Sequence, residues 1–145
     1  MTEPLTKWLN IASRYCRLYL DHELEKLGLN SSQHMYICSI CQNPGITQDY
    51  LYTNFHIHPS NITRSLNCLE KNGFIQRQPN EQDKRTSCLF PTQKALDTNQ
   101  QIKNIVKKWE KDMLKDLSAE DQQLFCRLMK KIGQRSVDEV QKFCS

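Results

Sequence analysis

The chain has 145 residues, which is the usual length of one domain and enough to bury a hydrophobic core. Hydrophobic residues make up 38% of the chain and charged residues 25%, so the composition is that of a folded protein with a polar surface and not of a disordered chain. The net charge of +4 at pH 7 is compatible with a nucleic-acid partner, and the presence of only four glycines excludes the glycine-rich loops that hold nucleotide phosphates.

Two helices are predicted in the first third of the chain. Apolar residues recur at three- and four-residue steps over residues 4–27 and predict an amphipathic helix that ends at Gly28. Residues 30–33, Asn-Ser-Ser-Gln, resemble a capping box and predict the start of a second helix. The Asn-Pro-Gly sequence at residues 43–45 ends that helix.

Two shorter helices follow. Thr47 is a suitable N-cap for a third helix over about residues 47–55. Pro59 suits the first turn of a fourth helix, because its missing N–H leaves no helical hydrogen bond unmade there. This fourth helix runs to about Asn72, where Gly73 allows a left-handed C-cap.

The pattern then changes to a hairpin and returns to helices. Residues 74–78 and 87–90 are short and partly alternating, and the polar segment between them predicts a β-hairpin with a long, charged tip. Thr92 predicts the start of a fifth helix, and Ser118 opens a capping box for a sixth.

This order of elements predicts a mainly α (α+β) fold in a single domain, residues 1–145. Residues of about 30–92 form a winged helix-turn-helix with a small β-hairpin wing, flanked by long terminal helices in residues 1–29 and 93–145. The terminal helices carry more apolar surface than the central unit can cover. A symmetric homodimer is therefore favoured, with an intrachain bundle as the alternative.

The fourth helix has two contrasting faces. At 100° per residue, Ile62, Leu66 and Leu69 fall together and face the core. The opposite face carries hydroxyl, amide and basic groups, which read base edges in the major groove of double-stranded DNA. The residues on this face or at its edge are Ser60, Thr63, Arg64, Asn67 and Lys71.

Further contacts to DNA are predicted at both ends of this region. Ser60 and Asn61 lie at the N-terminus of the fourth helix, where free N–H groups suit a phosphate. Residues 71–94 contain five basic and two acidic residues, a local net charge of +3. Of these, Lys84 and Arg85 lie at the hairpin tip, and arginine is favoured in a narrow minor groove.

The sequence from Ile46 to Thr92 resembles the MarR family of bacterial winged-helix transcription regulators. The resemblance is carried by the start of the fourth helix at residues 59–64, by its exit at residues 69–77 and by the Asp-x-Arg of the wing, Asp83 and Arg85. It implies a homodimeric, sequence-specific regulator, read here as a repressor that binds a pseudo-palindromic operator and is released by a small-molecule effector.

The resemblance also implies roles for single residues. It implies that Arg64 contacts the major groove, that Arg85 reaches the minor groove and that Asp83 holds Arg85 in place. Three positions depart from the family pattern, one of which is Ala95, where glycine is common. His58 stands where a capping Asp or Asn is common, which predicts a weaker helix start, and Pro91 replaces an aliphatic residue, which predicts a return strand with fewer hydrogen bonds.

Members of the family respond to a small molecule, an oxidant or a metal. By resemblance to members that bind phenolic ligands, a small aromatic or phenolic effector is expected near Thr63 and Arg77, with Tyr15 and Tyr36 lining the cavity. Arg77 could pair with a ligand carboxylate. The same tyrosine spacing is also that of ordinary core residues.

A thiol- or metal-responsive sensor of the same fold is an alternative. His34, Cys38 and Cys41 share one helix face and are suitable zinc ligands, but they are also core-facing positions, so packing is favoured and no metal or other cofactor is expected. Cys16 follows the Ser-Arg pair at residues 13–14, whereas the reactive cysteine of peroxide-sensing relatives precedes it.

The remaining features of the sequence bear on the class of protein and on its location in the cell. No catalytic grouping or cofactor loop is recognisable, so an enzyme is not expected. A winged-helix module for protein–protein contacts is a further alternative, because the acidic Glu81 and Asp83 reduce the positive charge of the hairpin tip. The chain has no apolar run of transmembrane length and no export signal, and its cysteine count of seven is odd. These features favour a cytoplasmic protein with reduced thiols and no membrane partner.

Overall fold

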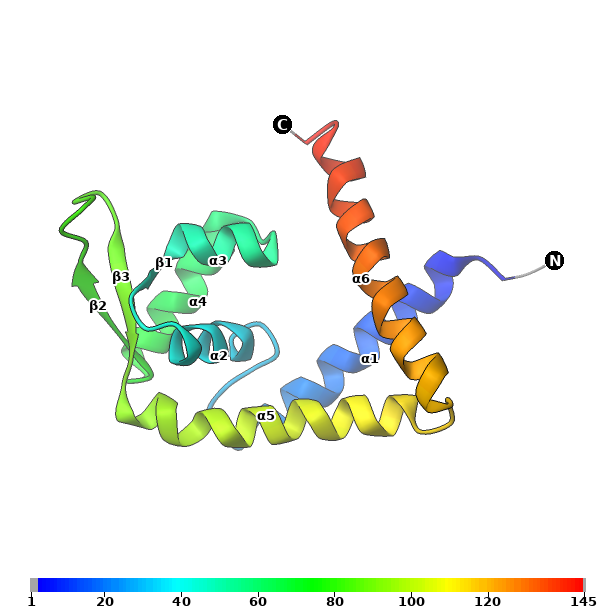
Figure 1. Ribbon diagram of the computed structural model, residues 1–145. Helices are drawn as coiled ribbons and strands as arrows, with labels where there is room; N and C mark the ends of the chain where they lie inside the picture. The colour runs from blue at the N-terminus through cyan, green and yellow to red at the C-terminus, as the bar shows by residue number, and fades with distance from the viewer. Residues whose placement is uncertain (1–2, 145) are drawn as a thin grey trace. The chain divides into compact units, whose positions relative to one another are not determined.

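The structure is a computed structural model that describes residues 3–144, and this part of the chain forms two compact units with a boundary between Trp109 and Glu110. Figure 1 labels the helices and strands. They are α1 (Leu5–Glu25), α2 (His34–Gln42), β1 (Ile46–Thr47), α3 (Gln48–Phe55), α4 (Pro59–Lys71), β2 (Ile75–Pro79), β3 (Ser87–Pro91), α5 (Gln93–Leu114) and α6 (Ala119–Gln141). The first unit contains α1 to β3 and most of α5, and the second contains the end of α5 and α6.

The predicted winged helix-turn-helix is confirmed in the first unit. Helices α3 and α4 follow one another as the helix-turn-helix, and β2 and β3 form an antiparallel hairpin beside them (Figure 1). The hairpin register pairs Ile75 with Pro91 and Pro79 with Ser87. The fold is therefore mainly helical with one small sheet, as the sequence pattern predicts.

One strand was not predicted. The two residues of β1 pair with β3, so that the sheet has three strands in the order β1-β3-β2, with Ile46 opposite Leu89. Gly45, at a φ of 95°, donates its N–H to the carbonyl oxygen of Leu89 at 2.7 Å and brings the chain alongside β3. A strand of two residues is too short to leave an alternating pattern in the sequence.

The expected loss of hydrogen bonds from the return strand at Pro91 is wrong. Strand β3 includes Pro91, and beyond it Thr92 donates its N–H to the carbonyl oxygen of Phe74 at 3.0 Å. Hydrogen-bonded pairs alternate along an antiparallel ladder, so the bonded pair of Thr92 and Phe74 leaves Pro91 at a position that donates nothing to β2. The missing N–H of Pro91 therefore costs the hairpin no bond.

The helix limits follow the predicted caps closely, with one shift. Thr47 caps α3 by accepting the N–H of Tyr50, and Ser118 caps α6 by accepting the N–H of Asp121. The second helix begins later than predicted, at His34. Residues 30–33 instead form a turn, because the side chain of Asn30 accepts the N–H of Ser32 at 3.0 Å. The capping-box bond still forms, from the N–H of Asn30 to Oε1 of Gln33.

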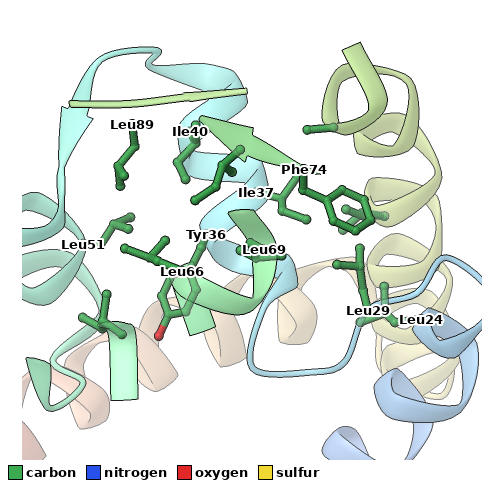
Figure 2. Close-up of a cluster of buried hydrophobic side chains, with 14 of the residues drawn as sticks. Leu24, Leu29, Tyr36, Ile37, Ile40, Leu51, Leu66, Leu69, Phe74 and Leu89 are labelled. Atoms are coloured by element: carbon green, nitrogen blue, oxygen red, sulfur yellow. The ribbon is translucent and has the colours of Figure 1, made fainter. Parts of the chain in front are cut away.

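A single hydrophobic core holds the first unit together. Figure 2 shows side chains from helices and strands meeting in one cluster, which includes Leu24 of α1, Ile37 of α2, Leu51 of α3 and Leu89 of β3. The predicted inner face of α4 is confirmed, since Ile62, Leu66 and Leu69 are each 0% exposed. Each such side chain contributes about 1.5–3 kcal/mol by its burial.

The second unit differs from the first in how far its apolar side chains are buried. None of the residues of α6 is buried, although the helix runs for 23 residues. Large apolar side chains are exposed along this unit: Met113, Leu117, Leu124, Phe125, Leu128, Met129, Ile132, Val140 and Phe143. The helix therefore has an apolar stripe without a cover in its own unit.

Candidate nucleic-acid interface

The start of α4 is capped by a histidine. Nδ1 of His58 lies 3.2 Å from the backbone nitrogen of Ser60 and accepts its N–H, and it lies 2.7 Å from Oγ of the same residue. A ring nitrogen accepts only in the neutral imidazole, so the capping form carries its proton on Nε2. The expected weakness of this helix start is thus corrected, because His58 supplies the acceptor that an aspartate would supply.

The end of α4 is closed by three separate contacts. Gly73, at a φ of 78°, donates its N–H to the carbonyl oxygen of Glu70, as the predicted left-handed cap requires. The ammonium of Lys94 donates to the carbonyl oxygen of Asn72 at 2.9 Å and lies 4.3 Å from the centre of the Phe74 ring. Lys94, one of the five basic residues counted around the hairpin, therefore stabilises the end of α4.

The outward face of α4 is exposed as predicted. The predicted residues Ser60, Asn61, Thr63, Arg64, Asn67 and Lys71 are all exposed, and Pro59, Cys68 and Glu70 are the other exposed residues of this helix. The acid on the same turn as Lys71 is Glu70, and its Oε1 pairs with the guanidinium of Arg77 at 3.0 Å. The pair joins α4 to β2, so the acidic group is neutralised within the fold and the exposed face stays cationic.

A residue that sequence reasoning missed lies beside this face. Gln48, the first residue of α3, directs its Nε2 at Oγ1 of Thr63, 2.6 Å away, and at the carbonyl oxygen of Pro59, 3.3 Å away. Gln48 and Thr63 are 15 residues apart and belong to different helices. No local pattern in the sequence could have indicated this contact.

The wing carries the predicted pair of Asp83 and Arg85. Oδ1 of Asp83 accepts the backbone N–H of Arg85 at 3.1 Å and its Nε–H at 3.0 Å, while Oδ2 accepts from Nη2 at 3.2 Å. The hydrogen bonds from Arg85 hold the pKa of the Asp83 carboxyl below its usual range. The Arg85 side chain is nevertheless 90% exposed, so its guanidinium is oriented by Asp83 and still open to another molecule.

Two further residues shape the wing tip. Nδ2 of Asn80 donates to Oγ1 of Thr86 at 3.0 Å, and the N–H of Asn80 donates to the carbonyl oxygen of Thr86. Thr86 in turn donates its N–H to the carbonyl oxygen of Asp83. These bonds close the loop that displays Lys84 and Arg85, and their partners were not singled out from the sequence.

The residues expected around an effector occupy different environments. Tyr15 is 57% exposed on α1, whereas Tyr36 is 1% exposed and packs edge-on against Phe55. Burial raises the pKa of Tyr36, which is consistent with a core residue. The guanidinium of Arg77 is held by Glu70, so a ligand carboxylate would have to displace that acid.

The candidate metal ligands of α2 are packed groups. Nδ1 of His34 lies 2.8 Å from the carbonyl oxygen of Ser31, and burial lowers the pKa of the ring, so it is a neutral donor. Cys38 and Cys41 pack against the core, and burial raises the pKa of both thiols, which disfavours the thiolate that binds metals. Within residues 3–144, no three metal-ligating side chains gather in a cluster.

The helices also bear on a membrane location. Across the described part of the chain, none of them combines the length and the apolar character that crossing a bilayer requires.

Comparison with known proteins gives evidence on the family of this chain that does not depend on the geometry of α4 and the wing. The sequence pattern of the MarR family matches residues 29–87. The HTH-type transcriptional regulator YwoH of Bacillus subtilis is 28% identical over 122 residues, a match that covers 84% of this chain and 88% of YwoH. A second regulator of that species, YybA, is 38% identical over 73 residues, and there the chain spans about half of the relative's length.

A solved structure is similar over most of the chain. A mutant of MarR from E. coli, crystallised in complex with operator DNA, is 25% identical and has a TM-score of 0.81. The match covers 89% of this chain and 93% of that protein. The likeness thus extends well beyond residues 29–87.

Proposed function

Because the chain belongs to the MarR family, whose members are DNA-binding transcriptional regulators and not enzymes, we propose that it is a homodimeric repressor of bacterial transcription. It acts in the cytoplasm and binds a pseudo-palindromic operator. The observation that carries the proposal is the division of α4, which buries its apolar side completely and leaves a cationic, hydrogen-bonding side exposed.

The exposed face of α4 suits the major groove. Arg64 and Asn67 lie there with Lys71, and none of them is engaged by an acid within the described chain. An arginine can donate two bonds to guanine, and an asparagine can pair with adenine. Ser60 and Asn61, at the N-terminus of the same helix, are proposed phosphate contacts through their side chains, because His58 accepts the backbone N–H of both residues.

The wing suits the neighbouring minor groove. Arg85 is held by Asp83 in a forked arrangement, which reduces the freedom that its side chain would lose on binding. Lys84 is exposed beside it and adds a second positive charge for the phosphate backbone. The proposed roles are a minor-groove contact for Arg85 and a supporting role for Asp83.

The terminal helices are proposed to form the dimer. The stripe on α6 is exposed throughout its length, and α1 adds Leu5, Trp8, Tyr15 and Leu18, all more than half exposed. A second copy of the chain would cover such surfaces in a symmetric interface. The two copies of α4 would then meet half-sites about 34 Å apart, one turn of the duplex.

Effector control is proposed to act through the guanidinium of Arg77. The pair of Glu70 and Arg77 links α4 to β2, and a phenolic carboxylate could compete with Glu70 for the guanidinium. Titration of 2-hydroxybenzoate against the protein–DNA complex tests this, with release expected for the natural chain and lost in Arg77→Ala. Absence of release by the natural chain would remove this effector class.

The central experiment is selection of bound duplexes from a randomised DNA pool. We expect enrichment of a pseudo-palindrome and an affinity that falls steeply between low and high salt, because phosphate contacts dominate binding. Arg64→Ala is the test variant. Arg127→Ala is the matched control, since it removes the same charge from an exposed position on a different helix, α6. Failure to enrich any sequence would favour a protein–protein module.

A further inference from the structure

The contact between Gln48 and α4 has a defined direction. The carbonyl oxygen of Pro59 only accepts hydrogen bonds, so the Gln48 atom that faces it and Thr63 must be the amide nitrogen. Oγ1 of Thr63 therefore accepts one hydrogen from Gln48 at 2.6 Å. Its own hydrogen is donated to the carbonyl oxygen of Pro59, one turn earlier in α4, at 3.0 Å.

This arrangement restricts what Thr63 can offer to another molecule. A hydroxyl has a single hydrogen and two lone pairs, and here the hydrogen and one lone pair are used inside the protein. Thr63 is exposed at the edge of the cationic face of α4. The part of its side chain that makes no hydrogen bond is the methyl group, and an apolar contact with the methyl group of thymine is one of the few apolar signals in the major groove.

Gln48 also selects the rotamer of Thr63. A threonine in a helix divides between two χ1 rotamers, because its hydroxyl bonds the preceding turn in one of them. In that rotamer Gln48 adds a second bond to the same oxygen. Without Gln48, rotation about χ1 could carry the methyl group out of this position as the two rotamers interconvert.

We propose that Gln48 is a positioning residue for DNA reading: it engages the Thr63 hydroxyl so that α4 presents the Thr63 methyl group to a thymine. This inference rests on the proposed function, since it concerns how α4 recognises a duplex. It assigns to the first turn of α3 a part in base recognition, although Gln48 itself touches no base.

The test uses the duplex that the natural chain selects from a randomised pool. Each thymine is replaced singly by deoxyuridine, which removes the C5 methyl group and leaves base pairing unchanged. We expect one thymine in each half-site at which this replacement weakens binding about fourfold, the effect of one buried methyl group. Thr63→Ser keeps the hydroxyl and lacks the methyl group, so it should bind both duplexes equally. Thr63→Val keeps a methyl group and should retain most of the discrimination.

Gln48 variants examine the positioning role itself. Gln48→Ala leaves Thr63 with its methyl group but without the second bond, so the thymine-to-uracil ratio should fall to about twofold. The salt dependence and the melting temperature should stay close to those of the natural chain, which a merely structural role would not predict. Gln42→Ala, at an exposed glutamine of α2, is the matched control and should keep the fourfold ratio.

The outcomes separate the two proposals. Selective binding without a uracil-sensitive thymine, or a sensitivity that Thr63→Ser keeps, overturns the inference and leaves the DNA-binding function standing. A ratio unchanged in Gln48→Ala removes Gln48 from base reading. Failure of the natural chain to select any duplex overturns the proposed function, and the inference with it.

Discussion

Two helices of this chain, α4 and α6, are both amphipathic, but the apolar face of α4 is buried and that of α6 is exposed. On α4, the apolar residues Ile62, Leu66 and Leu69 are 0% exposed, because the core of the first unit covers them. On α6, no residue is buried, and Phe125 and Leu128 are each 45% exposed. The difference lies in which surface each helix leaves exposed: α4 exposes its polar face, and α6 exposes its apolar face as well.

The largest expected effect comes from the buried side of α4. Leu66→Ala should lower the free energy of unfolding by about 2–5 kcal/mol, because it leaves a cavity in a core that is fully closed. Denaturant unfolding at low protein concentration measures it. Leu128→Ala makes the same chemical change on α6 and should cost far less under those conditions. Equal losses for the two variants would contradict the contrast between the helices.

The exposed side of α6 is tested by self-association. Leu128→Asp should weaken dimer formation on the order of 100-fold, because a symmetric interface contains the charge twice in an apolar setting. Sedimentation over a range of concentrations measures the change. Gln123→Asp, a similar change on the polar side of α6, is the control and should leave the dimer intact. A natural chain that is monomeric at micromolar concentration would exclude the dimer.

The exposed side of α4 is tested by DNA affinity. Arg64→Ala should weaken operator binding by about 1–3 kcal/mol and relax the base preference at one position of each half-site. The melting temperature should not change, because the Arg64 side chain is exposed. Competition gel shifts with single-base operator variants measure both effects. Operator binding as tight as that of the natural chain would remove Arg64 from the interface.

The wing should contribute less than α4. Arg85→Ala should reduce the slope of log affinity against log salt by about one for each subunit, because one cationic contact is lost. Asp83→Asn should have a smaller effect, since it removes the charge but not the acceptor that orients Arg85. A marked fall in melting temperature for Arg85→Ala would instead make Arg85 a structural residue.

The smallest effect concerns α2, which shares the core with α4. Burial lowers the pKa of His34, so below about pH 6.5 the unfolded chain takes up a proton at this residue that the folded chain does not. Stability should therefore fall as the pH drops from 6.5 towards the folded-state pKa. His34→Gln should reduce this dependence in thermal unfolding between pH 5 and 7, whereas His22→Gln, at an exposed histidine, should preserve it.

The elements of this fold are predictable where their signals are local. The caps at Thr47 and Ser118 and the left-handed Gly73 each depend on residues within one turn of chain, and the structure confirms all three. Strand β1 was missed because two residues show no period. The Pro91 expectation was wrong because the effect of a proline depends on which positions of the ladder donate a bond, and that is set by register.

The residues of the candidate interface likewise include some that local patterns in the sequence predict and others that they do not. The exposed face of α4 follows from its helical period, so Arg64 and Asn67 could be assigned to it in advance. The acceptor role of His58 and the contact of Gln48 with Thr63 could not, since each depends on where a side chain points. The likeness to known regulators supports the type of function but identifies neither contact.

The amino-acid sequence by itself determined which faces of the helices are apolar and where most of the helices begin and end, because periodicity and capping act over a few residues. Only the tertiary structure decided which polar groups remain available to a partner. Glu70 is engaged by Arg77, the Thr63 hydroxyl by Gln48, and Lys94 by the end of α4. Such pairings join residues that lie seven or more positions apart and beyond a single helix or strand, and hydrogen bonds and ion pairs form only where the packed core brings the two groups within reach.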